Sequence, residues 1–262
     1  MKLLNLNICI KISNTKEVGN FLIEQNADFV TIQEIVRHLE PGVFEEYRSK
    51  EDIEKIVGDI YPYKFFGPLW VTDVSFKNNQ VHRDYGGMIE QGNEILSKHP
   101  IVSASHAFFY KSYAYIQDWT NWKQEDHGRA LTSSIHDING KRLTIFNIHG
   151  IWSEGKIDDD RTIKECEYVL EKASESNMPT IIAGDFNLYP NSPSIAILDN
   201  KFRNLIKEYG IKTTRPAFKD NNDVGLNVVD YVFVNDKVKV NDFKVLDVTV
   251  SDHLPLVLEF EI

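Results

Sequence analysis

Four apolar runs in this sequence lead directly into polar residues of the kinds that bind metal ions or phosphate groups. These polar residues are Glu34 after residues 29–33, His149 after 146–148, Asp185 and Asn187 after 180–184, and Asp230 after 228–229. A fifth pair, Asp252 and His253, comes just before the last apolar run. Ligands of α/β proteins bind at strand ends. The pattern therefore predicts one site assembled from several strand ends.

The order of the predicted elements gives an α/β fold class. In the first half, a strand with alternating apolar residues over 4–12 precedes a helix that begins near 13–15, a strand at 29–33 and a helix capped by Ser49. The second half repeats this order with a strand at 143–148, a helix starting at 158–160 and a strand at 180–183. Two last strands are expected at 228–234 and 254–260, and a loop at 112–126. No linker or low-complexity segment interrupts the chain, so we expect a single domain over residues 1–262.

Composition narrows the classes of function. The formal net charge is −10, which argues against a tight, nonspecific nuclease, because long nucleic acids are gripped mainly by lysine and arginine. No apolar run is long enough for a stable membrane insertion, and residues 1–13 do not resemble a signal peptide. The two cysteines, Cys9 and Cys166, lie far apart, which indicates reduced thiols and a cytoplasmic protein. No unassigned apolar stripe specifies an oligomeric state.

Each polar motif also has a purely structural explanation. Glu34 could end a strand in water, His149 could be a turn residue, residues 185–187 could form an Asx turn, and 252–253 could be an ordinary loop. Asp230 differs because an unpaired carboxylate inside an apolar strand is costly, so it needs a partner. Five such motifs in one chain are hard to attribute to chance.

The ordered set of motifs resembles the endonuclease/exonuclease/phosphatase superfamily, whose members include deoxyribonuclease I and abasic-site endonucleases. The resemblance runs from Asn7 to Pro255 and is carried by residues 6–8, 32–34, 92–98, 147–149, 184–187, 229–231 and 251–255. It implies a four-layered α/β sandwich of two packed mixed sheets with helices outside. It also implies an enzyme that hydrolyses phosphate esters with a divalent cation.

The resemblance assigns the metal ligands first. Glu34 would be the main ligand of Mg²⁺, with Mn²⁺ as the alternative ion, and Asn7 and Asp252 would lie close by. Carboxylate oxygens are the ligands that such hard cations prefer. The bound ion would neutralise charge on the ester and lower the pKa of bound water.

The remaining motif residues receive catalytic roles. His253, paired with Asp230, would contact the scissile phosphate, because a histidine held by a carboxylate favours its charged form. Asp185 would orient or deprotonate the attacking water, or protonate the leaving oxygen. Asn187 and His149 would hold phosphate oxygens.

Three further residues are candidates for substrate binding. Arg129 resembles a phosphate-contacting arginine of some members, and a surface salt bridge is the alternative. Trp119 and Trp122 belong to an aromatic segment, residues 108–122, that could stack on a base or cover a lipid or sugar. An ordinary packed flap would explain the same segment.

Two departures narrow the family's activities. Cys9 stands where abasic-site endonucleases tend to have another acidic metal ligand, and the Ser-Trp-Cys-Asp element of inositol phosphatases is absent. We therefore expect a phosphodiesterase or phosphatase that acts on a small or non-duplex phosphate ester. Nucleic acid stays open as a substrate, with a DNA endonuclease or exonuclease as the alternative. A catalytically inactive binding module is disfavoured because every motif position is filled.

Overall fold

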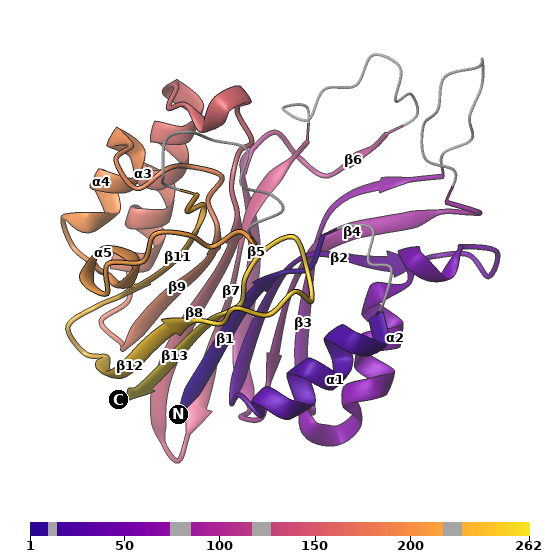
Figure 1. The fold of residues 1–262 in the computed structure, drawn as a ribbon, viewed down its shortest axis with the longest axis horizontal. Helices are drawn as coiled ribbons and strands as arrows, with labels where there is room; N and C mark the ends of the chain where they lie inside the picture. Colours follow the sequence, from indigo (N-terminus) through magenta and orange to yellow (C-terminus); the bar gives the residue numbers. More distant parts are fainter. Residues whose placement is uncertain (10–14, 74–84, 117–126, 217–226) are drawn as a thin grey trace.

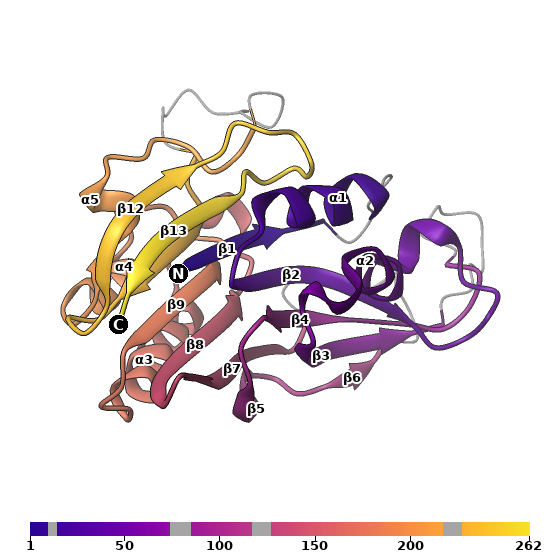
Figure 2. The same cartoon turned by 90° about the horizontal axis from the view of Figure 1, so that it is seen from below.

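Two β-sheets packed face to face form the centre of the protein (Figures 1 and 2). The computed structural model describes residues 1–9, 15–73, 85–116, 127–216 and 227–262. Within this part of the chain, one sheet has the strand order β12-β13-β1-β2-β4-β3-β6 and the other has β10-β11-β9-β8-β7-β5. Both sheets are mixed, because β1 pairs with β2 and β8 with β9 in parallel, whereas their other neighbours run antiparallel.

The first sheet is built mainly from the two ends of the chain. Its strands are β1 (Lys2–Asn7), β2 (Phe29–His38), β3 (Tyr63–Thr72), β4 (Ile89–Ser97), β6 (Ala114–Tyr115), β12 (Lys239–Val245) and β13 (Leu256–Glu261). The second sheet contains β5 (Ile101–Tyr110), β7 (Arg129–Ile138), β8 (Lys141–His149), β9 (Thr180–Asp185), β10 (Arg203–Asn204) and β11 (Asp230–Val234).

Helices cover the outer face of each sheet (Figure 1). The first sheet carries α1 (Thr15–Gln25) and α2 (Ser49–Val57), and the second carries α3 (Asp160–Ser174), α4 (Pro193–Asp199) and α5 (Leu205–Glu208). Short 3-10 helices lie at Glu45–Tyr47, Gly58–Ile60 and Glu154–Lys156. Burial of the apolar helix faces stabilises these layers. The predicted four-layered α/β sandwich is confirmed.

Alternate side chains of the first strand, β1, point to opposite faces of its sheet, one covered by helices and the other by the second sheet. Leu4 and Leu6 are buried against α1 and α2, whereas Asn5 is fully buried between the sheets. There Asn5 accepts hydrogen bonds from Thr31 Oγ1 at 2.8 Å and Gln33 Nε2 at 2.9 Å. Gln33 Nε2 also donates to Asn147 Oδ1 of the opposite sheet at 2.7 Å. Buried polar side chains thus connect the two sheets.

Several element boundaries predicted from the sequence were wrong. β2 continues past Glu34 to His38, because a bulge between Ile32 and Ile35 absorbs the irregular residue without ending the strand. Ser49 does not cap α2, since its hydroxyl accepts the N–H of Val36 at 2.8 Å. The interval predicted as a loop contains β6, which pairs with β3.

Candidate active site

Three site residues predicted from the sequence lie side by side in the second sheet. His149 ends β8, Asp185 ends β9, and Asp230 begins β11. The pairing register sets His149 opposite Asp185 and Asp185 opposite Asp230. β8 and β9 are parallel and β11 is antiparallel to them, so two strand ends and one strand start meet at the same edge. The sheet itself therefore fixes the spacing of these side chains.

Asn7 and Glu34 reach the same place from the first sheet. Asn7 ends β1, and Glu34 occupies the bulge of β2 with a left-handed φ of 60°. A β-bulge changes the direction of the side chains in it, and here it directs Glu34 towards the site although the strand continues past this residue. Asn7 Nδ2 donates to Glu34 Oε1 at 3.2 Å and to Asp185 Oδ2 at 3.1 Å. This amide therefore joins the two sheets at the site.

His149 lies against both carboxylates. Its Nε2 is 3.7 Å from Glu34 Oε1 and 3.9 Å from Asp185 Oδ2. Burial lowers the pKa of His149 well below its ordinary value, and the nearby charge of Arg129 lowers it further. The ring is therefore neutral at pH 7 and can donate one hydrogen bond to a substrate oxygen.

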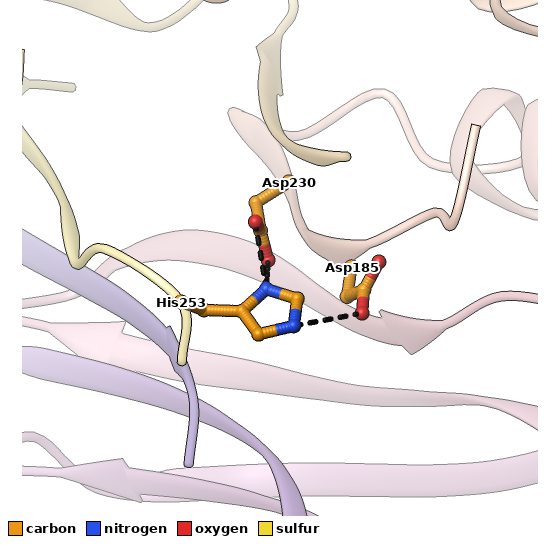
Figure 3. A group of neighbouring side chains, drawn as sticks. All are labelled: Asp185, Asp230 and His253. Carbon is orange, nitrogen blue, oxygen red and sulfur yellow. Dashed lines mark hydrogen bonds and ion pairs between the residues drawn. The ribbon is translucent and has the colours of Figure 1, made fainter. Parts of the chain in front are cut away.

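Asp230 and His253 form a buried pair (Figure 3). Nδ1 of His253 lies 2.9 Å from Asp230 Oδ2, which also accepts the hydroxyl of Thr214 at 2.6 Å. Nε2 of the same ring points towards Asp185 Oδ2 at 3.7 Å. Burial lowers the pKa of His253, but the carboxylates of Asp230 and Asp185 outweigh it and raise the pKa above its ordinary value. The ring thus has a fixed orientation and favours the charged form.

Asp185 is ionised at neutral pH despite its burial. Burial raises its pKa, but interactions with His253, His149 and Lys156 outweigh this effect and lower the pKa to about 2. Its Oδ1 accepts the backbone N–H of Asn187 at 2.8 Å. A carboxylate in this state accepts protons but does not donate them.

The structure adds residues that the sequence analysis did not single out. Lys156 Nζ donates to Asn187 Oδ1, and Arg215 Nη1 donates to His253 Nε2 at 2.8 Å. Lys156 comes seven residues after the predicted strand end at His149, whereas Arg215 lies before the strand predicted at 228–234 and follows no predicted strand end. The rule used for Glu34 and Asp185 would have found Lys156 if it had been applied to the loop after His149.

The substrate-binding candidates have different outcomes. Arg129 begins β7 and is only 2% exposed, so the surface salt bridge considered as an alternative is wrong. Its charge acts on Glu34, Glu165 and Asp185, and its Nη1 has no hydrogen-bond partner among the described residues. Trp119 and Trp122 lie outside the described residues.

Two groups of side chains at this edge could hold a cation. One combines the carboxylates of Glu34 and Asp185 with Asn7, whose amide oxygen here accepts the N–H of Cys9 at 2.9 Å. Asp252 lies near it, because Ser251 Oγ donates to the carbonyl oxygen of Asn7 at 2.7 Å. The other consists of Asp185, Asp230 and His253, whose ligand atoms lie within 4.8 Å of one another. Their oxygen-rich chemistry suits a hard divalent ion.

A buried glutamate on α3 supports the segment after His149. Oε2 of Glu165 accepts the N–H of Ile151 at 2.7 Å, and the side chain is 1% exposed. A Cβ on Gly150 would lie 2.5 Å from Oε1 of this carboxyl group. Burial raises the pKa of Glu165 to about 8, against the opposing effects of the Ile151 N–H and Arg129. Glu165 is therefore largely neutral in the folded protein at pH 7.

This neutral carboxyl makes stability depend on pH. The folded protein binds the proton more tightly than the unfolded chain, so this contribution is complete below about pH 4.5 and is lost as the pH rises towards 8. Glu165→Gln keeps an acceptor for Ile151 but does not titrate. We expect its free energy of unfolding, relative to wild type, to rise by roughly 3 kcal/mol between pH 5 and pH 8. Urea unfolding at each pH measures this difference, with the exposed Glu167→Gln on the same helix as the control. A constant difference would contradict the assignment.

Comparisons with known proteins identify the family and the fold of this chain. A sequence model of the endonuclease/exonuclease/phosphatase family matches residues 7–253. No curated protein sequence matches. Among solved structures, an endonuclease/exonuclease/phosphatase from Beutenbergia cavernae aligns with a TM-score of 0.78 and 17% identity, covering 100% of this chain and 71% of that one.

Two similar structures have more specific names. A mannosyl-6-phosphatase from Bacteroides thetaiotaomicron aligns with a TM-score of 0.70 and 15% identity, covering 100% of each chain. A humanized TDP2 from D. rerio aligns with a TM-score of 0.68 and 15% identity, covering 100% of this chain and 99% of that one. At these identities the likeness shows the fold alone. The family match extends over nearly the whole sequence, from Asn7 to His253, and the chain belongs to the endonuclease/exonuclease/phosphatase family.

Proposed function

We propose that residues 1–262 form one domain that hydrolyses phosphate esters with the help of a divalent cation. The substrate is a small or non-duplex ester, cleaved by a phosphodiesterase or phosphatase activity. The main support is the convergence of Asn7, Glu34, His149 and Asp185 from two sheets, with contacts of 3.1–3.9 Å between them. The family match supports the reaction class.

Glu34 is the proposed main ligand of the cation, Mg²⁺ or alternatively Mn²⁺. Both ring nitrogens of His253 have hydrogen-bond partners, Asp230 and Arg215, which makes the group around His253 the weaker candidate. Asn7 and Asp252 would complete the Glu34 site, Asn7 after rotation of its amide so that the oxygen faces the ion. A bound divalent cation neutralises charge on the ester oxygens.

Asp185 is the proposed proton acceptor. The water oxygen forms a new bond to phosphorus, its proton passes to the Asp185 carboxylate, and the bond between phosphorus and the leaving oxygen breaks. The low pKa of Asp185 keeps its carboxylate ionised at neutral pH. It can therefore accept a proton from water but carries none to donate to the leaving oxygen. His253, oriented by Asp230, contacts the phosphate as a cation. Asn187 and His149 hold two of its oxygens through N–H donors.

A cytoplasmic location is also part of the proposal. Its support is the free state of Cys9 and Cys166, since free thiols are typical of proteins kept in reducing conditions. No helix in the described ranges combines the length and apolar character needed to cross a membrane.

Turnover on a panel of esters tests this function. The panel contains abasic duplex DNA, plain single- and double-stranded DNA, RNA, sphingomyelin and small synthetic phosphate esters, each with Mg²⁺, Mn²⁺ or EDTA. We expect turnover of small esters or lipids that EDTA reduces by at least about 10³-fold, because the ion supplies several kcal/mol of charge stabilisation. Much faster cleavage of DNA would favour the alternative, a DNA endonuclease or exonuclease. Turnover that survives EDTA would contradict the metal-dependent reaction.

A further inference from the structure

Three cationic side chains converge on the acidic site of a chain whose net charge is −10. They are Arg129 from the start of β7, Lys156 from the end of the 3-10 helix that follows β8, and Arg215 from the segment before β11. Arg129 and Arg215 both act as like charges on Lys156, and Asp185 and Asp230 act on it as opposite charges. The three cations and the catalytic carboxylates are therefore close enough for the charge of each to affect the others.

Lys156 is held in the site at a conformational cost. Its backbone has a left-handed φ of 56°, a region that it shares with Glu34 and Asn187. Such conformations are unfavourable for residues other than glycine and concentrate at functional sites. Its Nζ donates to Asn187 Oδ1 and lies 5.7 Å from the ring centre of Trp152. Burial lowers the pKa of Lys156 to about 8, so most molecules carry its charge at pH 7.

Arg215 contacts the residues next to the expected position of the phosphate. Nη1 donates to Nε2 of His253 at 2.8 Å, and Nη2 lies 3.5 Å from Oδ2 of Asp252. An arginine N–H can only donate, so Nε2 of His253 accepts here, and His253 can contact an ester as a cation only when an ester oxygen takes over this N–H of Arg215. A bound phosphate would offer oxygens to both Arg215 and His253. Guanidinium groups match phosphate oxygens in two-point contacts.

Arg129 gives a second, independent observation in favour of an anion-binding site. It is almost fully buried, and its Nη1 has no hydrogen-bond partner in the part of the chain that the structure describes. A buried charged donor without a partner is costly unless a ligand satisfies it. An anion in the site would do so.

The number of cationic donors at the site matches a phosphomonoester better than a phosphodiester. Glu34, Asp185, Asp230 and Asp252 supply four negative charges, and the three cations offset three of them. A divalent cation would therefore leave one positive charge in excess, which favours an anionic ligand. A phosphomonoester has three non-bridging oxygens, one for each of the three cations, and a phosphodiester has two. A buried cationic donor left without an acceptor is costly, and a mismatch of this kind decides between related ligands.

We propose that Lys156 and Arg215 form, together with Arg129, an anion-binding site that selects phosphomonoesters over phosphodiesters. This inference rests on the proposed hydrolase function and names its substrate class. Arg129, Lys156 and Arg215 each bind one of the three non-bridging oxygens of a phosphomonoester. In a methyl diester one of these oxygens carries the methyl group, so one cation is left without a charged partner.

Two esters with the same leaving group test the selection: 4-nitrophenyl phosphate and methyl 4-nitrophenyl phosphate. We expect wild type to prefer the monoester in kcat/KM by at least about 10-fold. Lys156→Met and Arg215→Gln should each lower kcat/KM for the monoester by about 10–100-fold, because a hydrogen bond to a charged group contributes about 1.5–3 kcal/mol. The loss on the diester should be smaller, about 5-fold. Lys164→Met, an exposed position on α3, is the matched control.

A binding measurement separates this proposal from the hydrolase function. Calorimetry with inorganic phosphate and EDTA-treated protein should give a Kd that rises at least about 10-fold in Lys156→Met and stays constant in Lys164→Met. Equal losses on the two esters, or a wild type that prefers the diester, would overturn the selection. If wild type hydrolyses neither ester but Lys156→Met still weakens phosphate binding, the hydrolase function fails and the anion site stands. Phosphate binding that is unchanged in both Lys156→Met and Arg215→Gln would overturn the anion site.

Discussion

Replacing Asp185 by Asn is expected to lower kcat/KM for the hydrolysed ester by about 10⁴-fold, at the upper end of the range for loss of a general base. Asp185 contacts more site residues than any other carboxylate described above. Its Oδ2 lies 3.1 Å from Asn7 Nδ2, 3.7 Å from His253 Nε2 and 3.9 Å from His149 Nε2. An amide of the same size keeps the packing but cannot accept a proton from water. The loss should therefore appear in kcat, with little change in KM.

The control for this variant is Asp59→Asn, which removes an exposed carboxylate in the short 3-10 helix that follows α2. It should keep the wild-type rate. Circular dichroism and thermal unfolding of both variants establish that the fold is intact. Wild-type turnover by Asp185→Asn would remove Asp185 from the mechanism and place the proton acceptor elsewhere.

The sequence predicted those site residues whose position depends only on the ends of neighbouring strands. His149 and Asp185 end neighbouring parallel strands, and Asp230 begins the antiparallel strand beside them. Their apolar runs are unambiguous, and a sheet places strand ends next to one another whatever the intervening helices contain. The fold class and the four layers came from the same repeated order of strands and helices, together with the family resemblance.

The features that the sequence could not predict depend on geometry that no local pattern encodes. Glu34 was expected to end its strand, but a bulge lets the strand continue while the side chain serves the site. Arg129 was a candidate phosphate contact with a surface salt bridge as the alternative, and only the structure shows that it is buried at the start of β7. Glu165 was not singled out in the sequence. Only the tertiary structure sets it beneath Gly150.

The net charge of the chain indicates which large ligands it can bind, but it does not indicate the charge of the site. A charge of −10 argues against a long polyanionic ligand. It does not describe the site itself, where Arg129, Lys156 and Arg215 lie close to the carboxylates. Arg215 and His253 are 38 positions apart in sequence, yet they share a 2.8 Å contact. Local charge must therefore be counted from the folded arrangement before a substrate class is inferred.

Asp230 and His253 are expected to act as one unit. We predict that His253→Gln lowers kcat/KM by about 10³-fold, that Asp230→Asn lowers it by about 10²–10³-fold, and that the double variant loses little more than His253→Gln alone. The reason is that Asp230 touches the ring and not the substrate. Both of its oxygens lie within 3.0 Å of Nδ1, and Thr214 holds one of them. Asp230 is thus a positioning residue whose effect passes through His253.

The double-variant cycle distinguishes this role from a catalytic one. Residues that act through the same group show strongly non-additive losses, whereas independent residues multiply. We would measure kcat and KM for all four proteins on the preferred ester, after thermal unfolding has shown each to be folded. A double variant that falls by the product of the single losses, about 10⁵–10⁶-fold, would mean that Asp230 acts on the reaction separately. A near-equal loss would instead mean that the carboxylate contributes by fixing which nitrogen of His253 faces the phosphate, because Asp230 holds Nδ1 and leaves only Nε2 directed at the site.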